Sequence, residues 1–174
     1  MKPNIAYFPS MLTKNVLIFS ILLMTVTIHG KTLNQLKKYP IIELTHPNGR
    51  KIKTYVAKGI KEQTLGLSGL MEKNLKNDHA MLFYYTKDGT HQFWMPDTYF
   101  NLDIFFLDKN YRVLSVERNV PHHPGMIEPP KIYRTKIHQA RHVLEMKASS
   151  PLAKSLRPKQ ALKVTKGLSL LEKE

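Results

Sequence analysis

Short stretches of alternating apolar and polar residues begin at residue 41, and residues that favour turns separate them. This alternation, with a period of two, is typical of half-buried β-strands. The dipeptides Asn48-Gly49 and Asp88-Gly89 accept the positive φ angles of tight turns, and Asp108 begins a third turn. The pattern therefore predicts β-hairpins over residues 41–57, 80–95 and 102–117.

Helical periodicity is confined to two short segments. The first, over residues 61–67, has apolar residues at helical spacing. The second, over residues 150–156, has a proline in its first turn. A stretch with four prolines and a glycine cannot continue as a helix or a central strand, so it is predicted to be a loop. In chain order, these elements and two further strands are a helix over 61–67, a loop over 121–130, a strand over 141–147, a helix over 150–156 and a strand over 160–166.

This set of elements predicts a mainly β fold class, an antiparallel β-sandwich or barrel-like domain with one or two short helices. A chain of 174 residues suits one domain with a sizeable core. We assign a signal peptide or N-terminal membrane anchor to residues 1–30, a linker to 31–40, a single β domain to 41–167 and a polar tail to 168–174.

The N-terminal segment predicts where the protein acts. An uncharged apolar stretch over residues 16–28 follows Lys14 and has the length of the hydrophobic region of a signal peptide. It is shorter than the roughly 20 residues of a typical membrane span. Cleavage is expected near Gly30, and an uncleaved anchor is the alternative. We therefore expect an exported protein, either periplasmic or anchored in the membrane and facing the periplasm.

The charge balance bears on the partners of the protein. The chain has 27 Lys and Arg against 13 Asp and Glu, a formal net charge of +14. These basic residues are scattered, whereas a nucleic-acid footprint gathers on one face, so we expect no nucleic-acid partner. An anionic envelope polymer is compatible with the charge, and the membrane is expected to be contacted only through an uncleaved N-terminal segment. The absence of cysteine excludes disulfides and thiolate chemistry.

The stretch FWMPDTYFNLD, residues 93–103, has the residue types of a ligand site. It contains the only tryptophan of the chain, whose flat ring suits sugars or cations. In the strand that follows, side chains alternate between the two faces, and this places Asp103 beside large apolar residues. A carboxylate in that position must be solvated, paired or hydrogen-bonded. The predicted ligand-binding residues are Trp94, Met95, Asp97, Thr98 and Asp103.

Other interpretations of the same residues remain open. Asp103 would have a structural role if it accepted backbone N–H groups of the 96–101 loop, and Trp94 would have one as a core anchor. In an enzyme, Asp103 would be the general acid or base, with Asp97 or Glu145 as a second carboxylate. We assign no catalytic residue.

A copper site is a further alternative. Copper outside the cytoplasm is bound by imidazole and thioether groups, but methionine is also an ordinary core residue and the spacing here matches no strong metal signature. We therefore predict no metal ligand and no cofactor. The residues concerned are His122, His123, Met126, Met71, Met81 and Met95.

Five segments together resemble a known family: GLSGLM, AMLFYY, FWMPDTYFNLDIFFLD, RVLSVE and HVLEM. Over about residues 50–166 the chain resembles the bacterial and archaeal family known as domain of unknown function 192. The resemblance implies a compact, mainly β domain, often behind a signal peptide, and no established reaction. The chain has Ala80 where the family usually has Gly, and Pro96-Asp97 where it has Lys-Asn, so the charge beside Trp94 differs.

The sequence thus predicts an exported small β domain that binds a small polar ligand such as a carbohydrate or an envelope glycan. A carboxylate-dependent hydrolase acting through Asp103 is the alternative. An extracytoplasmic copper-binding protein is a weaker alternative.

Overall fold

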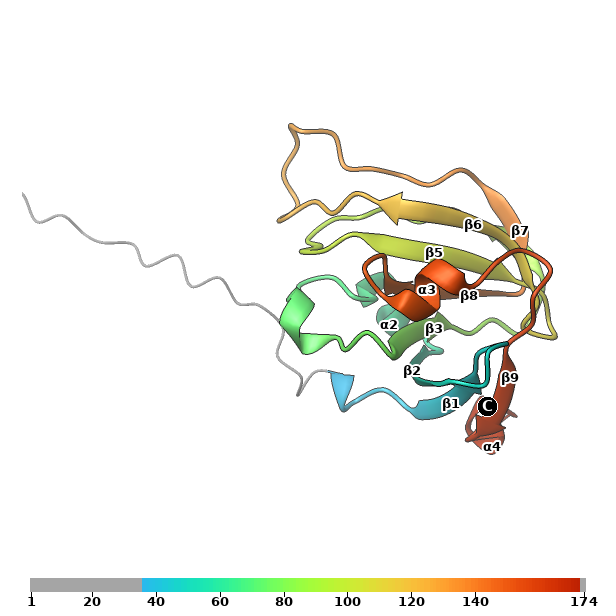
Figure 1. Cartoon of the computed structure of the whole chain (residues 1–174). Helices are drawn as coiled ribbons and strands as arrows, with labels where there is room; N and C mark the ends of the chain where they lie inside the picture. Colours follow the sequence, from blue (N-terminus) through green and yellow to red (C-terminus); the bar gives the residue numbers. More distant parts are fainter. Residues whose placement is uncertain (1–35, 173–174) are drawn as a thin grey trace, which may run out of the picture.

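The computed structural model describes residues 36–172, which form nine strands joined by turns and short helices (Figure 1). The predicted signal peptide or anchor lies outside the described residues. Among residues 36–172, no helix has both the length and the apolar character needed to cross a membrane. The elements are β1 (Ile41–Thr45), β2 (Lys51–Ala57), α2 (Ile60–Leu65), η1 (Glu72–Asn74), β3 (His79–Phe83), β4 (Gly89–His91), β5 (Leu102–Leu107), β6 (Val113–Val120), β7 (His138–Ala140), β8 (His142–Lys147), α3 (Pro151–Ser155), β9 (Lys163–Lys166) and α4 (Leu168–Glu172).

Seven strands form one sheet in the order β6-β5-β8-β3-β2-β1-β9, and β4 pairs with β7 in a separate small sheet. The prediction of a mainly β domain is confirmed. The large sheet is mixed, however, because β2 and β3 run parallel. The chain between them contains α2 and η1, and this crossover is long enough to bring β3 back in the same direction as β2. The sheet is open, with β6 and β9 at its edges.

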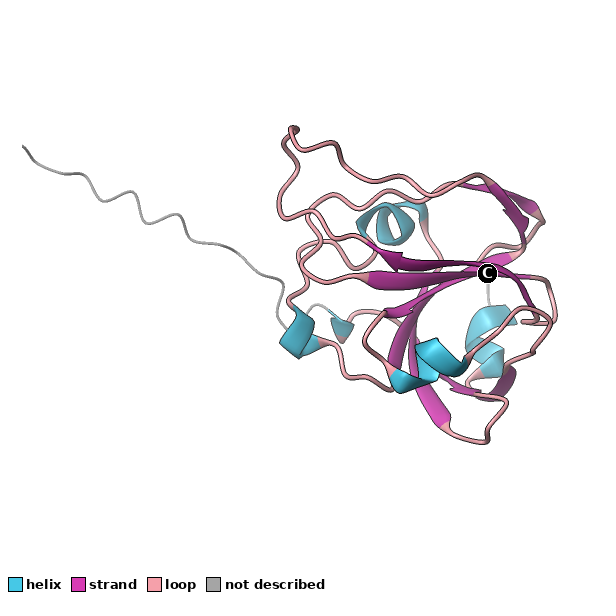
Figure 2. Cartoon of the chain, turned by 45° about the horizontal axis from the view of Figure 1, so that its top comes forward, coloured by secondary structure: helices cyan, strands magenta, loops and turns pink. Residues whose placement is uncertain are grey.

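Both faces of the large sheet are covered, and Figure 2 shows helices on either side of it. One face carries Met81, Phe83 and Phe106, which pack with residues from the loops after α2 and before β5. The other face carries Phe105 and Leu144, which pack with residues from α3 and α4. The domain therefore has two hydrophobic layers, one on each side of the sheet.

The three central strands are buried at every position. In β3, β5 and β8 each residue is shielded from solvent, because neighbouring strands and both covering layers enclose them. This double burial explains near-continuous apolar runs such as LDIFFL. Polar residues in these strands, among them Asp103 and Glu145, must find a partner or border a cavity.

Two of the three predicted hairpins are confirmed. β1 pairs with β2, and β5 pairs with β6 around a turn in which the Asp108 carboxylate accepts the N–H groups of Asn110 and Arg112. The prediction of a hairpin over 80–95 is wrong, because β4 pairs with β7. β3 lies inside the large sheet, where β2 and β8 occupy both of its edges.

The ends of the domain extend beyond the predicted limits. Leu36 and Tyr39, within the predicted linker, are buried in the hydrophobic layer that contains Phe83. Residues 168–172, within the predicted polar tail, form α4, and Leu171 is buried in the other layer. The core thus recruits apolar residues from both flanking segments.

Candidate functional site

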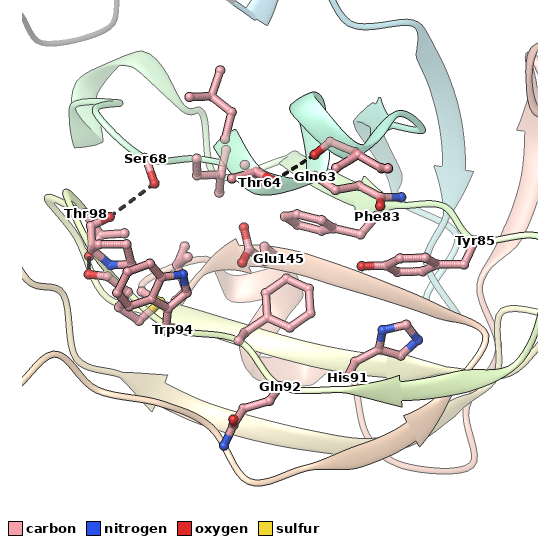
Figure 3. A pocket seen from close by; sticks show the side chains of 18 of the residues that line it. Gln63, Thr64, Ser68, Phe83, Tyr85, His91, Gln92, Trp94, Thr98 and Glu145 are labelled. Atoms are coloured by element: carbon pink, nitrogen blue, oxygen red, sulfur yellow. Dashed lines mark hydrogen bonds between the residues drawn. The ribbon is translucent and has the colours of Figure 1, made fainter. Parts of the chain in front are cut away.

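A cavity of about 370 Å³ lies between the α2 region and residues 90–98, on the face of the sheet that carries Glu145 (Figure 3). Its volume is within the range of small-molecule sites, about 300–1,000 Å³. Phe83 and Phe93 form an apolar wall and meet edge to face, with ring centroids 4.8 Å apart. The cavity is therefore built by the strands of the sheet together with two loops that cover them.

Trp94 stands at the border of this cavity. The backbone around it pairs with residues 133–135: the Met95 N–H donates to the Tyr133 carbonyl at 3.2 Å, and the Thr135 N–H to the Phe93 carbonyl at 2.8 Å. The indole lines the cavity and remains 46% exposed. Trp94 is therefore a surface aromatic residue and not a core anchor.

The turn after Trp94 is held by hydrogen bonds to two other loops. The backbone at Asp97 has a φ of 52°, its N–H donates to the Gly125 carbonyl, and its carbonyl accepts the Gly69 N–H. The Thr98 hydroxyl donates to the Met95 carbonyl at 2.9 Å and accepts the His123 N–H at 2.8 Å. The WMPDT segment is thus fixed between the loop after α2 and the proline-rich loop.

Asp103 lies on the opposite face of the sheet. A β-bulge in the β5–β6 pairing places both Arg118 and Asn119 opposite it, since Leu102 pairs with Val120 and Ile104 with Glu117. Oδ2 accepts from Arg118 Nη1 at 2.5 Å, and Oδ1 accepts the Asn119 N–H at 2.8 Å. The expected partners in the 96–101 loop are therefore replaced by partners on the neighbouring strand.

The structure brings together three of the five predicted residues, Trp94, Met95 and Thr98, at the cavity. Asp97 and Asp103 are not among the residues that line it. The Asp97 carboxylate accepts the hydroxyl of Tyr99 at 2.9 Å instead. Asp103 faces away because alternate residues of β5 point to opposite sides of the sheet.

The carboxyl group of the cavity belongs to Glu145. This residue lies on β8 directly opposite Met81 of β3 and Ile104 of β5, so its side chain shares their face of the sheet. It is only 5% exposed, and burial raises the pKa of its carboxyl to about 8. No hydrogen bond or ion pair among residues 36–172 engages the carboxyl. A buried, unpartnered carboxyl in a cavity is an unusual feature that calls for an explanation.

Further polar side chains reach the cavity from three segments. Ser68 Oγ donates to the Pro96 carbonyl at 3.1 Å, and Gln63 Nε2 to the Tyr84 carbonyl at 2.9 Å. Burial and the charge of Glu145 raise the pKa of the Tyr85 hydroxyl to about 12, so this group stays neutral. Sequence reasoning did not assign these residues to the site, because no local motif connects α2, β3 and β8.

A chain of hydrogen bonds outside the cavity joins β6 to β7. Ser115 Oγ lies 2.9 Å from His138 Nδ1, and His138 Nε2 lies 2.9 Å from Glu117 Oε1. The imidazole of His138 is also stacked on the ring of Phe106, with the two ring centroids 4.0 Å apart. Because β7 pairs with β4, this cluster holds the strand that delivers His91 to the cavity.

The residues considered for copper do not assemble. His122 lies beside Asn101, whereas His123 Nε2 lies 3.0 Å from the Ile127 carbonyl. Met81 and Met95 are buried in the core, and Met126 is 67% exposed. Within the described part of the chain, no group of three or more His, Cys, Asp or Glu is arranged to hold a metal ion.

Comparison with known proteins concerns the family and the fold. The model of the family DUF192, described as uncharacterised, matches residues 43–164. A crystal structure from Sinorhizobium meliloti 1021, described as a proposed transcription regulator, is 22% identical, covers 72% of this chain and 95% of its own, and has a TM-score of 0.57. A protein of unknown function from Novosphingobium aromaticivorans DSM 12444 is 21% identical, covers 72% and 84%, and has a TM-score of 0.55. Similarity at this identity shows the fold alone. No protein of curated function matches the chain.

Proposed function

Because the chain belongs to the DUF192 family, whose description gives no activity, we propose a function from its cavity: a non-enzymatic domain that binds a small polar ligand such as a carbohydrate or an envelope glycan. The observation that carries this proposal is the half-exposed indole of Trp94 at the border of a cavity with hydroxyl, amide and carboxyl groups. Sites for small molecules combine an apolar wall with a few convergent polar groups.

The chemistry of the walls suits a sugar. The apolar face of a pyranose ring packs on an aromatic ring, and its hydroxyls need donors and acceptors around the edge. Trp94 supplies the ring, and Ser68 and Glu145 supply polar groups on two other sides of the cavity. Phe83 and Phe93 form an apolar wall, and a hydrogen bond made beside such a wall is stronger than one made in water.

Catalysis is less well supported than binding. In the described part of the chain, Glu145 is the one carboxyl among the residues that line the cavity, whereas most glycosidases need two carboxyl groups about 5–9.5 Å apart. Asp103, on which a hydrolase would depend, is held by Arg118 on the other face of the sheet. The described lining of the cavity therefore lacks the second carboxyl that such a hydrolase needs. A binding domain can use the single carboxyl of Glu145.

The place of action that we propose is outside the cytoplasm. The proposal rests on the apolar segment over residues 16–28 with Lys14 before it, the arrangement of a signal peptide or an anchor. Residues 1–40 fused to a reporter enzyme that is active only in the periplasm would test it. Reporter activity that persists when Ile18 and Leu22 are changed to Asp would contradict this part of the proposal.

The intrinsic fluorescence of the protein tests ligand binding, because Trp94 is the only tryptophan of the chain. We expect a saturable change in its emission when the purified full chain is titrated with monosaccharides and glycan fragments. Asp103→Asn is a suitable control, since Asp103 lies away from the cavity and the titration should be unchanged. An emission that no neutral or amino sugar alters would overturn the proposed function.

A further inference from the structure

The walls of the cavity differ in charge from the rest of the molecule. The chain has 27 lysines and arginines, yet none of them lines the cavity in the described part of the structure. Besides Glu145, the lining that residues 36–172 provide includes only two other side chains that titrate, Tyr85 and His91. A phosphate, sulfate or carboxylate ligand would therefore find no basic partner inside.

Glu145 has no partner of its own within residues 36–172, although its position would require one once it is ionised. Figure 3 shows its carboxyl pointing into the space between Trp94 and Phe83. A carboxylate in such surroundings is strongly disfavoured unless an opposite charge or several donors approach it. Once ionised, this carboxyl would therefore require a cation, and the described residues of the lining supply none.

Aromatic side chains surround this position. Phe83, Tyr85, Phe93 and Trp94 all line the cavity: Phe83 ends β3, Tyr85 lies just after it, and Phe93 and Trp94 follow β4. The Arg134 guanidinium already lies over the Trp94 ring, 5.1 Å from its centroid, so the rings nearest the sheet are the ones open to an ammonium group. The faces of aromatic rings attract ammonium groups by about 0.5–2 kcal/mol each, most strongly where water is excluded. Aromatic walls around a carboxyl are thus complementary to a protonated amine.

We propose that the sugar bound by this cavity carries a protonated amino group that pairs with Glu145, so that the ligand is an amino sugar. This inference rests on the proposed function, and it specifies the chemical class of the ligand. The pyranose ring would pack on Trp94 at the border of the cavity, and the ammonium group would enter toward the sheet. An N-acetylated or hydroxylated sugar lacks the positive charge that this position requires.

Proton exchange gives the proposal a distinctive signature. Burial raises the pKa of the Glu145 carboxyl to about 8, so the group is protonated at neutral pH when no ligand is bound. A bound ammonium group would lower that pKa. Binding of the amine therefore releases a proton, and the affinity should rise from pH 5 toward pH 8. His91 faces the same cavity with a lowered pKa, and its charging at low pH would act in the same direction. Tyr85 stays neutral throughout this range.

The experiment compares glucosamine, glucose and N-acetylglucosamine on the full chain, by Trp94 emission and by calorimetry in two buffers with different ionisation enthalpies. We expect glucosamine to bind at least about tenfold more tightly than glucose at pH 7, where the Glu145 carboxyl is still protonated and the amine still charged, with proton release. In Glu145→Gln this difference should disappear, so that glucosamine and glucose bind with similar affinity. His91→Gln should keep both the preference and the rise with pH.

The outcomes separate the inference from the proposed function. If glucose and N-acetylglucosamine bind as tightly as glucosamine across the pH range, the inference fails and the proposed function stands. If none of the three sugars nor longer glycan fragments binds, both fail. A preference for glucosamine that Glu145→Gln leaves intact would also overturn the inference, because the amine would then be recognised elsewhere.

Discussion

The Oδ2 atom of Asp103 and the Nη1 atom of Arg118 lie 2.5 Å apart on neighbouring strands. The same guanidinium donates to the carbonyls of Ala153 and Leu156 at the end of α3, and its carbon lies 5.0 Å from the centroid of the Phe105 ring. This ion pair therefore fastens β5, β6 and α3 to one another. Its position assigns Asp103 to the stability of the domain.

Replacing Asp103 by Asn should destabilise the fold without changing the affinity for sugars. The change leaves a guanidinium at the surface of the core with a weaker partner, and we expect a loss of about 2–3 kcal/mol in the free energy of unfolding. Urea denaturation measures this loss. Asp88→Asn removes the mostly exposed pair with Arg141 and should cost less than about 1 kcal/mol. Equal effects of the two changes would contradict the structural role.

Replacing Trp94 by Ala should weaken sugar binding and leave the stability of the fold nearly unchanged. Its indole is half-exposed, so we expect a loss of stability below about 1 kcal/mol but at least a tenfold weaker affinity for sugars, measured by calorimetry. Tyr133→Ala is the matched control, because Tyr133 is a partly exposed aromatic residue of the neighbouring segment and does not line the cavity. Unchanged affinity in Trp94→Ala would move the binding site elsewhere.

Glu145 should make stability decrease as the pH rises. Its pKa is about 8 in the folded protein and 4.5 in the unfolded chain, so the folded state binds the proton more tightly. The stability that the protonated carboxyl contributes is fully present below pH 4.5 and is lost as the pH rises to about 8. The free energy of unfolding falls by up to about 5 kcal/mol over this range. Denaturation of the wild type and of Glu145→Gln across this range measures the difference. Parallel curves for the two proteins would refute this assignment.

His142 should act in the opposite direction. Burial, together with the charge of Arg141, lowers its pKa from 6.5 to about 4 in the folded protein. The stability that depends on its neutral form is present above pH 6.5 and is lost as the pH falls toward 4, by up to about 3 kcal/mol.

The variant that tests this effect is His142→Phe, which retains an aromatic ring for stacking on Tyr84 and Tyr111. It loses the acceptor of the Tyr85 N–H, so we expect about 1–2 kcal/mol lower stability at pH 7 but a shallower decline toward pH 4. His122→Phe, at an exposed position, serves as the control in the same denaturation series. A decline as steep as that of the wild type would exclude His142 as its source.

Gly66 tests how the wall of the cavity is built. It has a φ of +48°, and a Cβ atom there would lie 3.0 Å from Cζ of Phe83. Gly66→Ala should therefore cost about 1–3 kcal/mol and weaken sugar binding by displacing Phe83. Gly49→Ala has the same kind of strain, with a φ of +85°, but nothing within 4 Å, so it should leave binding unchanged. Thermal unfolding and calorimetry compare the two variants.

Local chemistry was sufficient to predict the elements that are themselves local. Asn48-Gly49 and Asp108 encode turns between strands that are neighbours in the sheet, so both hairpins were predictable. Asp88-Gly89 carries the same signal, yet Gly89 pairs with Ala140, about fifty residues away. A turn signal indicates that the chain bends but does not specify which strand it meets afterwards.

The candidate site was predicted in part for the same reason. Trp94 and Thr98 lie within one short segment, and their residue types identified it. The environment of Glu145 depends on which strands flank β8, and nothing near residue 145 encodes that β3 and β5 do so. Asp103 was correctly expected to need partners, but Arg118 became one only through a bulge in the pairing of β5 with β6.

The strand order also governs when the protein can fold during its synthesis. β8 is inserted between β5 and β3, although it is among the last strands to be made. Until residue 147 has left the ribosome, β1–β2–β3 and β5–β6 are separate pieces with unpaired edges, which are the regions most prone to aggregation. Because β8 also carries Glu145, a nascent chain joins the two parts of its sheet and completes its cavity in the same late step, and only the edge strand β9 is added afterwards.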